Sequence, residues 1–77
     1  MSAALTALAP GQAGDICGFT SDDIQRLMEM GLVEGTTVEV LRYAPAGDPV
    51  EIRVMGYALS LRKAEAACIL LENVRPA

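Results

Sequence analysis

The sequence predicts a mainly β fold with one α-helix, arranged as a small barrel of five short strands. Gly and Pro residues interrupt the chain at intervals of roughly eight to twelve residues, a spacing typical of short strands joined by tight turns. Two segments, 36–41 and 50–55, alternate apolar and polar residues with the period of two of a β-strand. The 77 residues suffice for one domain, 1–77, because a chain of this length buries a single core. Residues 73–77 are expected to be a tail.

The first strand and the helix are predicted in the N-terminal half of the chain. Pro10 and Gly11 indicate a turn, and 13–19 has the composition of a strand that follows it. Thr20 is expected to be the N-cap of the helix, with Asp23 three residues later completing a capping box. The helix is expected to close at its C′ residue, Gly31. The apolar residues of this segment share one helical face: Ile24, Leu27 and Met28.

The two alternating segments are expected to form an antiparallel hairpin. Their inward Val and Ile side chains must face the same side of the sheet, which partly fixes the register. Pairing Val40 with Ile52 satisfies this condition. The same register places Glu39 opposite Arg53 on the outer face, where an opposite-charge pair contributes about 0.2–1 kcal/mol.

The last two strands are predicted at 57–61 and 67–72, joined by a short turn at 62–65. In the first of them, Leu59 and Leu61 should point inward, because alternate side chains of a strand lie on the same face.

The closing strand has a second apolar face. Because alternate residues of this strand point into the barrel, Cys68 and Leu70 should point outward. Either the N-terminal segment covers this face with Leu5 and Leu8, or the face joins copies of the chain in a homo-oligomer. Residues 1–9 are accordingly expected to form an added strand or a flexible arm.

Charge and cysteine content limit the class of partner and the compartment. Ten carboxylates against six thinly spread cations give a net charge of −4, so no nucleic-acid partner is expected. Cys17 and Cys68 are too few for the disulfide framework of a small secreted domain. The apolar start, 1–10, lacks the basic residues of a signal peptide, and the longest apolar run, 66–71, is too short to span a bilayer. These features predict a cytoplasmic protein with no direct membrane insertion.

Residue patterns for catalysis and for cofactor binding are absent from the sequence. The chain has no histidine, so its Ser and Cys residues lack the usual base that activates a nucleophile. Without histidine or a Cys-x-x-Cys pair, a zinc or iron site made by one chain is not expected. Asp22 and Asp23 are instead explained as residues that favour a helix start. The chain also lacks a Walker-type phosphate loop. We therefore expect no enzyme activity, no metal site and no cofactor.

Several short segments have an order and spacing that are informative when taken together. They are Leu27-Met28-Glu29-Met30-Gly31-Leu32 with Gly35, then Ala44-Pro45-Ala46-Gly47-Asp48-Pro49, then Gly56-Tyr57-Ala58-Leu59-Ser60-Leu61-Arg62, and finally Ile69 and Leu71. This set, which covers roughly 11–72, resembles the FeoA family of small SH3-like barrels associated with bacterial ferrous-iron uptake. The resemblance implies a non-catalytic accessory protein that contacts FeoB, the membrane permease with a G-protein domain, at the inner face of the cytoplasmic membrane.

Two other functions are consistent with such a barrel. A similar barrel forms the C-terminal domain of metal-dependent repressors related to the diphtheria-toxin repressor. The chain lacks the helix-turn-helix and metal-binding parts of such a repressor, so in this alternative it is a detached regulatory domain that binds a protein or peptide partner. The third alternative is a self-associating structural module that uses the outer face of the last strand.

Six outward residues are the candidates for partner binding. They belong to the helix and its exit, to the hairpin loop and to the residues beside the following turn: Met28, Glu29, Pro45, Asp48, Met55 and Tyr57. The loop 44–49 has an alternative explanation as a plain hairpin connection, because Gly47 and Asp48 both favour turns.

Overall fold

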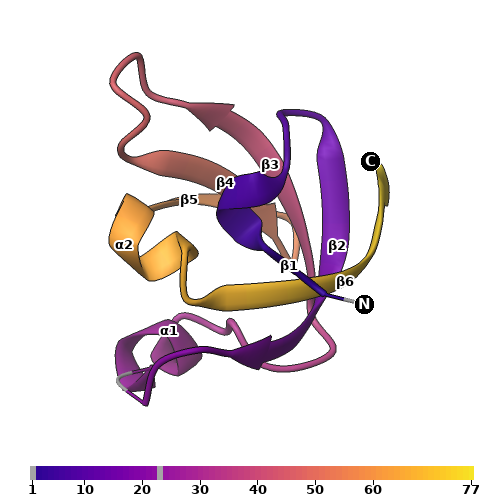
Figure 1. The fold of residues 1–77 in the computed structure, drawn as a ribbon, viewed down its shortest axis with the longest axis vertical. Coiled ribbons are helices and arrows are strands. Elements are labelled where there is room, and N and C mark those ends of the chain that lie inside the picture. The colour runs from indigo at the N-terminus through magenta and orange to yellow at the C-terminus, as the bar shows by residue number, and fades with distance from the viewer. Residues whose placement is uncertain (1, 23) are drawn as a thin grey trace.

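The computed structural model describes residues 2–22 and 24–77, which form one six-stranded antiparallel sheet curled around a core (Figure 1). The strands follow the spatial order β1-β6-β2-β3-β4-β5. The elements are β1 (Ala3–Ala4), η1 (Leu5–Ala7, a 3-10 helix), β2 (Gln12–Phe19), α1 (Gln25–Glu29), β3 (Thr37–Tyr43), β4 (Val50–Val54), β5 (Tyr57–Leu61), α2 (Lys63–Ala66) and β6 (Ile69–Pro76). The prediction of a mainly β, SH3-like barrel is confirmed, with β1 and α2 added to the expected five strands and one helix.

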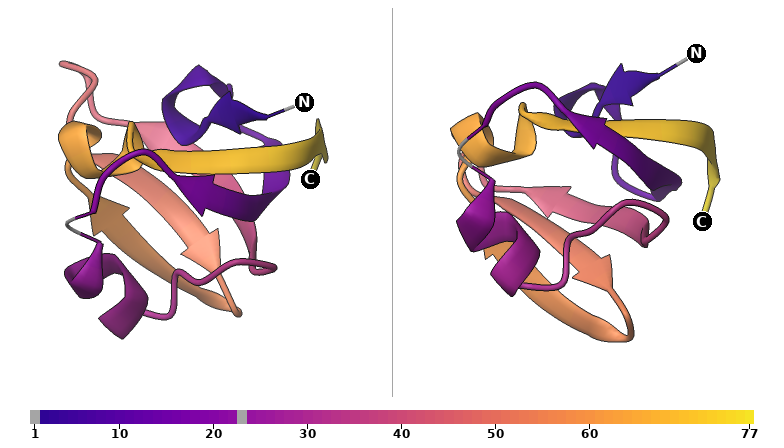
Figure 2. Two further views of the ribbon diagram at one scale, coloured as in Figure 1. Left: turned by 60° about the horizontal axis from the view of Figure 1, so that its bottom comes forward. Right: turned by 90° about the horizontal axis from the view of Figure 1, so that it is seen from below.

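A single apolar core fills the inside of the curled sheet (Figure 2). Its largest fully buried side chains are Leu5, Ile16, Leu32, Ile52, Leu61, Ile69, Leu71, Val38, Val40, Val50 and Val54. These residues are distributed along the chain from η1 to β6, so the core depends on nearly every part of the chain. The centre of the core is therefore packed with aliphatic side chains, because the sequence has only three aromatic residues.

The central hairpin has the predicted register. Val40 pairs with Ile52, and Glu39 pairs with Arg53. Both Val40 and Ile52 are completely buried, which confirms that the alternation of apolar residues sets the inward face. In β5, Leu61 is buried and Leu59 packs against the core, as expected.

Helix α1 begins later than predicted. The N–H of Thr20 donates to the carbonyl of Cys68 (2.9 Å), so Thr20 prolongs the pairing of β2 with β6 and does not cap the helix. The N-cap residue is Ile24, and the proposed capping partner Asp23 lies outside the described residues. A tertiary backbone hydrogen bond has thus replaced the local cap that the sequence suggests.

The end of α1 is as predicted. Gly31 has φ +88°, the left-handed conformation expected of a C′ residue. The N–H of Gly31 donates to the carbonyl of Met28 (3.0 Å), and the N–H of Leu32 donates to that of Leu27 (3.0 Å). These two bonds form a Schellman motif, which turns the chain sharply from α1 toward β3.

The expected turn at 62–65 is instead the start of a helix, α2. The backbone N–H of Arg62 donates to Glu65 Oε1 (3.0 Å), which satisfies a donor at the N-terminus of the helix. The N–H of Ala66 donates to the carbonyl of Arg62 (2.9 Å) and closes the first turn. The prediction of a plain turn was wrong because it ignored this side-chain cap.

Both ends of the chain belong to the fold. Strand β1 pairs with Leu70 and Leu71 of β6, and Leu5 and Leu8 are buried in the core. Within 1–9, the described residues thus include a two-residue strand, Ala3–Ala4, and a 3-10 helix, Leu5–Ala7. The expected tail at 73–77 largely continues β6, since Gln12 pairs with Pro76.

Candidate partner-binding surface

One side of the molecule carries the two α-helices and the β3–β4 loop. Figure 1 shows the loop, α2 and α1 following one another down this side, with both chain ends on the opposite side. Figure 2 shows the same separation from two other directions. We call the surface formed by 44–49, α2 and α1, together with the β4–β5 turn that contacts the end of α1, the helical side.

The lower part of the helical side joins the end of α1 to the β4–β5 turn. The Tyr57 hydroxyl donates to the carbonyl of Met30 (2.7 Å), just past the end of the helix. Met55 lies against Gly31, since a Cβ added to Gly31 would be 2.6 Å from Met55 Cε. A residue larger than Gly at position 31 would therefore clash with Met55 unless the Met55 side chain moved.

Apolar side chains are exposed in this region. Met28 is 49% exposed, Met55 65% and Tyr57 44%. Glu29, next to Met28 on α1, is also exposed. Four of the six candidate residues are thus brought to one end of the helical side.

The other two candidates lie at the opposite end of the central hairpin. Pro45 and Asp48 belong to the β3–β4 loop, and β4 separates this loop from the β4–β5 turn by about 13 Å of extended chain. Asp48 Oδ1 accepts a hydrogen bond from the backbone N–H of Lys63 (3.0 Å), which ties the loop to the start of α2. Gly47 has φ +86° and its N–H donates to the carbonyl of Ala44 (2.7 Å), so the loop also shows the predicted turn chemistry.

A cleft of about 420 Å³ lies between these two groups, at the junction of α1 and α2. Its lining includes Arg26, Leu27, Arg62, Ala64, Glu65 and Cys68. Arg26 forms an ion pair with Glu65, which links the two helices directly. Sequence reasoning missed this cleft, because its two arginines lie far apart in the chain and no spacing rule relates them.

The outer face of the last strand is only partly covered. Cys68 and Leu70 are both half-buried, but the prediction that they share one strand was wrong: β6 begins at Ile69, so Cys68 lies in the turn between α2 and β6, whereas Leu70 pairs with Ala4 of β1. The Cys68 thiol lies 3.3 Å from the carbonyl of Ala64, within reach of a weak hydrogen bond. Leu5 and Leu8 enter the main core and do not serve mainly as a cover for this face. Self-association through Cys68 and Leu70 stays a prediction.

Tyr43 holds the N-terminal segment in place. Its hydroxyl lies 2.5 Å from the carbonyl oxygen of Leu8 and 3.3 Å from that of Thr6. Burial raises the pKa of Tyr43 above its ordinary value, so the hydroxyl keeps its proton to a higher pH than a free tyrosine does. This contact helps to keep the two N-terminal leucines in the core.

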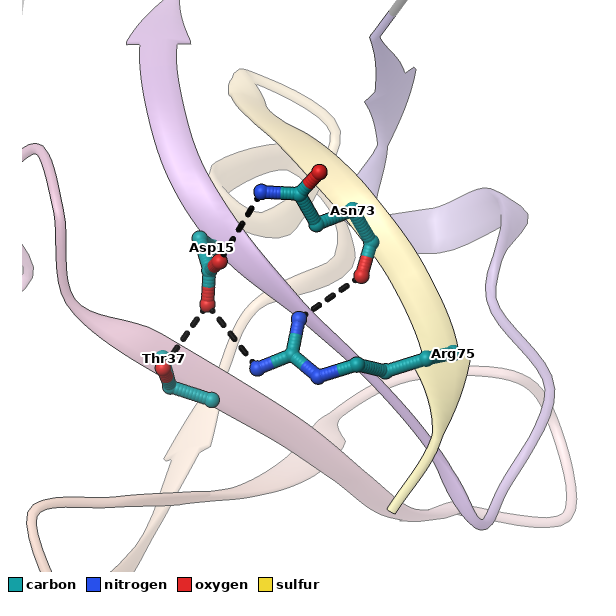
Figure 3. A network of polar contacts seen from close by, with 4 residues as sticks. All are labelled: Asp15, Thr37, Asn73 and Arg75. Atoms are coloured by element: carbon teal, nitrogen blue, oxygen red, sulfur yellow. Dashed lines mark hydrogen bonds and ion pairs between the residues drawn. The ribbon is translucent and has the colours of Figure 1, made fainter.

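A polar network joins three strands through Asp15 (Figure 3). The carboxylate of Asp15 accepts hydrogen bonds from Thr37 (2.7 Å), Arg75 (3.1 Å) and Asn73 (3.2 Å). These bonds, that from Thr37 most of all, hold the pKa of Asp15 below its ordinary value of 3.8. Asn73 has φ +54° at an irregularity in the β2–β6 pairing. The network therefore fixes the bend of β6 that brings its end back to β2.

Two further properties concern metals and membranes. Within 2–22 and 24–77, no group of three or more Cys, Asp or Glu side chains is placed to hold a metal ion. In the same residues, no helix has the length and apolar character needed to cross a membrane.

Comparison with known proteins relates the chain to iron-transport proteins. It is 48% identical over 50 residues to an Fe(2+) transport protein A/Fe(2+) transporter FeoB fusion protein of Porphyromonas gingivalis. This stretch is 65% of the present chain but only 6% of that relative, so the chain spans a small part of the fusion protein.

Solved structures share the fold. A FeoA-like protein from Clostridium acetobutylicum superposes with a TM-score of 0.80 and 37% identity, over 92% of this chain and 85% of that one. FeoA of Stenotrophomonas maltophilia, an SH3 domain protein whose structure contains zinc, gives a TM-score of 0.74 and 26% identity, over 94% of this chain and 89% of that one. A manganese-dependent transcriptional repressor gives a TM-score of 0.79 at 18% identity, over 91% of this chain and 40% of that one, which shows the fold alone.

A family model matches nearly the whole chain. The sequence model of the FeoA domain matches residues 3–73, from β1 into β6. With the barrel and its order of strands in place, the chain belongs to the FeoA domain family.

Proposed function

We propose that this chain is a non-catalytic accessory domain of ferrous-iron transport that docks on the cytoplasmic part of a FeoB-like permease. The observation that carries the proposal is the Porphyromonas gingivalis fusion, in which a related segment and a FeoB transporter share one polypeptide. A fusion keeps two domains at a high effective concentration, so even a weak contact between them is populated. A domain that has the same role without being fused to the permease must bind the permease through its own surface.

The helical side is the surface that we assign to this interface. Both chain ends lie on the opposite side, so a polypeptide attached to either end leaves the helical side uncovered (Figure 1). The exposed apolar residues Met28, Met55 and Tyr57 supply the kind of side chain that partner interfaces bury at their centre. Glu29 lies beside them, and Pro45 and Asp48 extend the surface to the loop at the start of α2.

The barrel of the manganese-dependent repressor supports a second role less strongly. At 18% identity the likeness carries the fold and no functional residue. A detached repressor-type domain would bind a DNA-binding regulator and would have no affinity for a permease.

The test is co-purification of the untagged chain with a tagged FeoB-like permease, in parallel with its isolated cytoplasmic domains. We expect saturable binding to the whole permease, and iron uptake by cells that depends on the chain. A chain that associates with neither the permease nor its cytoplasmic domains would remove the proposal. Exclusive binding to a winged-helix regulator would replace it with the repressor-type role.

A further inference from the structure

The cleft between α1 and α2 has a charge that differs in sign from that of the whole chain. Two guanidinium groups, Arg26 and Arg62, and one carboxylate, Glu65, lie in its lining, which gives +2 − 1 = +1 for these groups. The chain as a whole carries −4. The described lining of the cleft therefore carries a net positive charge on an acidic protein.

Glu65 does not leave a free negative charge in the cleft. Its Oε2 pairs with Arg26, and its Oε1 accepts the backbone N–H of Arg62 (3.0 Å). Both carboxylate oxygens are thus engaged, and the charge of Arg26 is balanced. Among the ion pairs of residues 2–22 and 24–77, none includes Arg62, whose guanidinium remains available at the rim.

The remaining lining is apolar or weakly polar. Leu27 is almost completely buried beneath the cleft, and Ser21, Ala64 and Cys68 complete its described lining. A volume of about 420 Å³ lies within the range of about 300–1,000 Å³ that is typical of ligand pockets. Among the residues that the structure describes, the cleft thus combines the apolar Leu27 at its base with one guanidinium, that of Arg62, that has no ion-pair partner.

We infer that this cleft binds an acidic side chain, Asp or Glu, flanked by apolar residues on a segment of the partner protein. A guanidinium recognises a carboxylate through two parallel N–H···O bonds, whereas the apolar base takes the flanking side chains. The next residue of α1 after Leu27 is the exposed Met28, so the segment can continue from the cleft onto the apolar part of the helical side. This inference rests on the proposed function, because it names the chemistry of the docking segment.

The direct test uses short capped peptides and the intact chain. One peptide carries Glu between two Leu residues, its partner carries Gln in place of Glu, and succinate serves as a free dicarboxylate. The two cysteines report the site: Cys68 lines the cleft, whereas Cys17 does not. The measurement is the rate at which each thiol reacts with iodoacetamide, followed by mass spectrometry.

We expect the Glu peptide to slow the reaction of Cys68 in a saturable way and to leave Cys17 unchanged. The Gln peptide should bind about 10-fold more weakly or worse, because Gln lacks the negative charge and the second acceptor oxygen of Glu. Protection by succinate equal to that by the Glu peptide would overturn the assignment to a protein segment. Equal protection by the Glu and Gln peptides, or none by either, would overturn carboxylate recognition.

Variants of Arg62 separate the inference from the proposed function. Arg62→Ala removes the guanidinium but keeps the backbone N–H that donates to Glu65, so the fold should persist. We expect it to weaken binding of both the Glu peptide and the permease by about 10-fold, with partial recovery in Arg62→Lys, since an ammonium keeps the charge but not the fork. Arg53→Ala, on the exposed outer face of β4, is the matched control and should bind normally. If Arg62→Ala binds the permease as well as the original chain does, the cleft inference fails while docking itself stands.

Discussion

Met55 combines an exposed side chain with a backbone conformation that is unusual for it. Its φ is +49°, and Gly56 follows with φ +82°, so both central residues of the β4–β5 turn are left-handed. Such two-residue turns favour Asn, Asp or Gly, and another L-residue costs roughly 1–2 kcal/mol in this conformation. With 65% of the side chain exposed, burial offsets little of that cost. Strain of this kind is concentrated at functional sites, which agrees with a binding role for Met55.

Met55→Asn should make the protein more stable and its docking weaker. Asn tolerates the left-handed conformation, so the free energy of unfolding should rise by about 0.5–1 kcal/mol. Urea denaturation of the two proteins measures this difference. A loss of more than about 1 kcal/mol would show that the contact of Met55 with Gly31 outweighs the backbone strain.

The outward position of Met55 could be predicted from the alternation of β4, but its φ could not. Methionine carries no local signal for a left-handed residue, and only the Gly that follows it suggests a tight turn. The same limit applies to Arg26 and Arg62, whose meeting at one cleft depends on the packing of two helices that are distant in sequence.

Helix α1 depends on its tertiary contacts. Gln25–Glu29 is five residues long, far below the length at which an isolated helix is stable in water. Leu27 anchors it in the core, Arg26 ties it to α2, and Tyr57 holds the carbonyl of Met30. The position of the proposed docking surface thus follows from these anchors.

Tyr57→Phe removes the anchor at the helix exit and keeps the ring. The lost hydrogen bond should lower the free energy of unfolding by about 0.5–1.5 kcal/mol. Amide hydrogen exchange of Gly31 and Leu32, which donate to carbonyls of α1, should become faster, whereas exchange in the β3–β4 hairpin should follow only the global change. Unchanged exchange at Gly31 and Leu32 would show that the hydroxyl does not hold the helix.

The bend of β6 should be sensitive to acid through Asp15. Because the pKa of Asp15 is lowered by folding, its ionised form stabilises the protein above the ordinary value of 3.8, and this contribution is lost as pH falls through the lower folded value. Asp15→Asn should therefore be less stable than the original chain near neutral pH, and the gap should close in acid. Urea midpoints at about pH 6 and about pH 3 measure it, and a gap that does not shrink would contradict the assignment.

At the scale of elements, the pairing of Val40 with Ile52 could be predicted, whereas the irregularity after Val40 and the start of the helix could not. Val40 and Ile52 reveal their register because a slip of one residue would expose every inward side chain. Thr20 has the composition of a helix cap, yet its N–H pairs with Cys68 across the sheet. A pattern of residues that are close in sequence gives no information about a hydrogen-bond partner that is distant in sequence.

At the scale of the whole molecule, the N-terminal segment completes the barrel. Leu5 is completely buried and Leu8 nearly so, although this part of the sequence shows no strand or helix periodicity. The sequence left open whether 1–9 is an added strand or an arm, because only packing against β6 decides between them.

Leu5→Ala should cost about 2–5 kcal/mol of unfolding free energy, through lost burial and the cavity left behind. A 77-residue domain has a total stability of only about 4–12 kcal/mol, so this single change should bring it close to unfolding. Thermal melting followed by circular dichroism checks this prediction. A loss below about 1 kcal/mol would mean that the segment is dispensable to the core.

The measurement that tests docking through the helical side most directly compares two matched substitutions in binding to the intact permease. Met28→Glu places a charge on α1, where the exposed apolar residues meet, and Val74→Glu places the same charge near the end of β6, close to the chain ends. The two side chains are similarly exposed, at 49% and 42%, so both variants should fold. We predict that Met28→Glu weakens binding at least about 10-fold, as the loss of a central contact does, and that Val74→Glu binds like the original chain. Equal affinities for the two variants, or a loss confined to Val74→Glu, would contradict docking through the helical side.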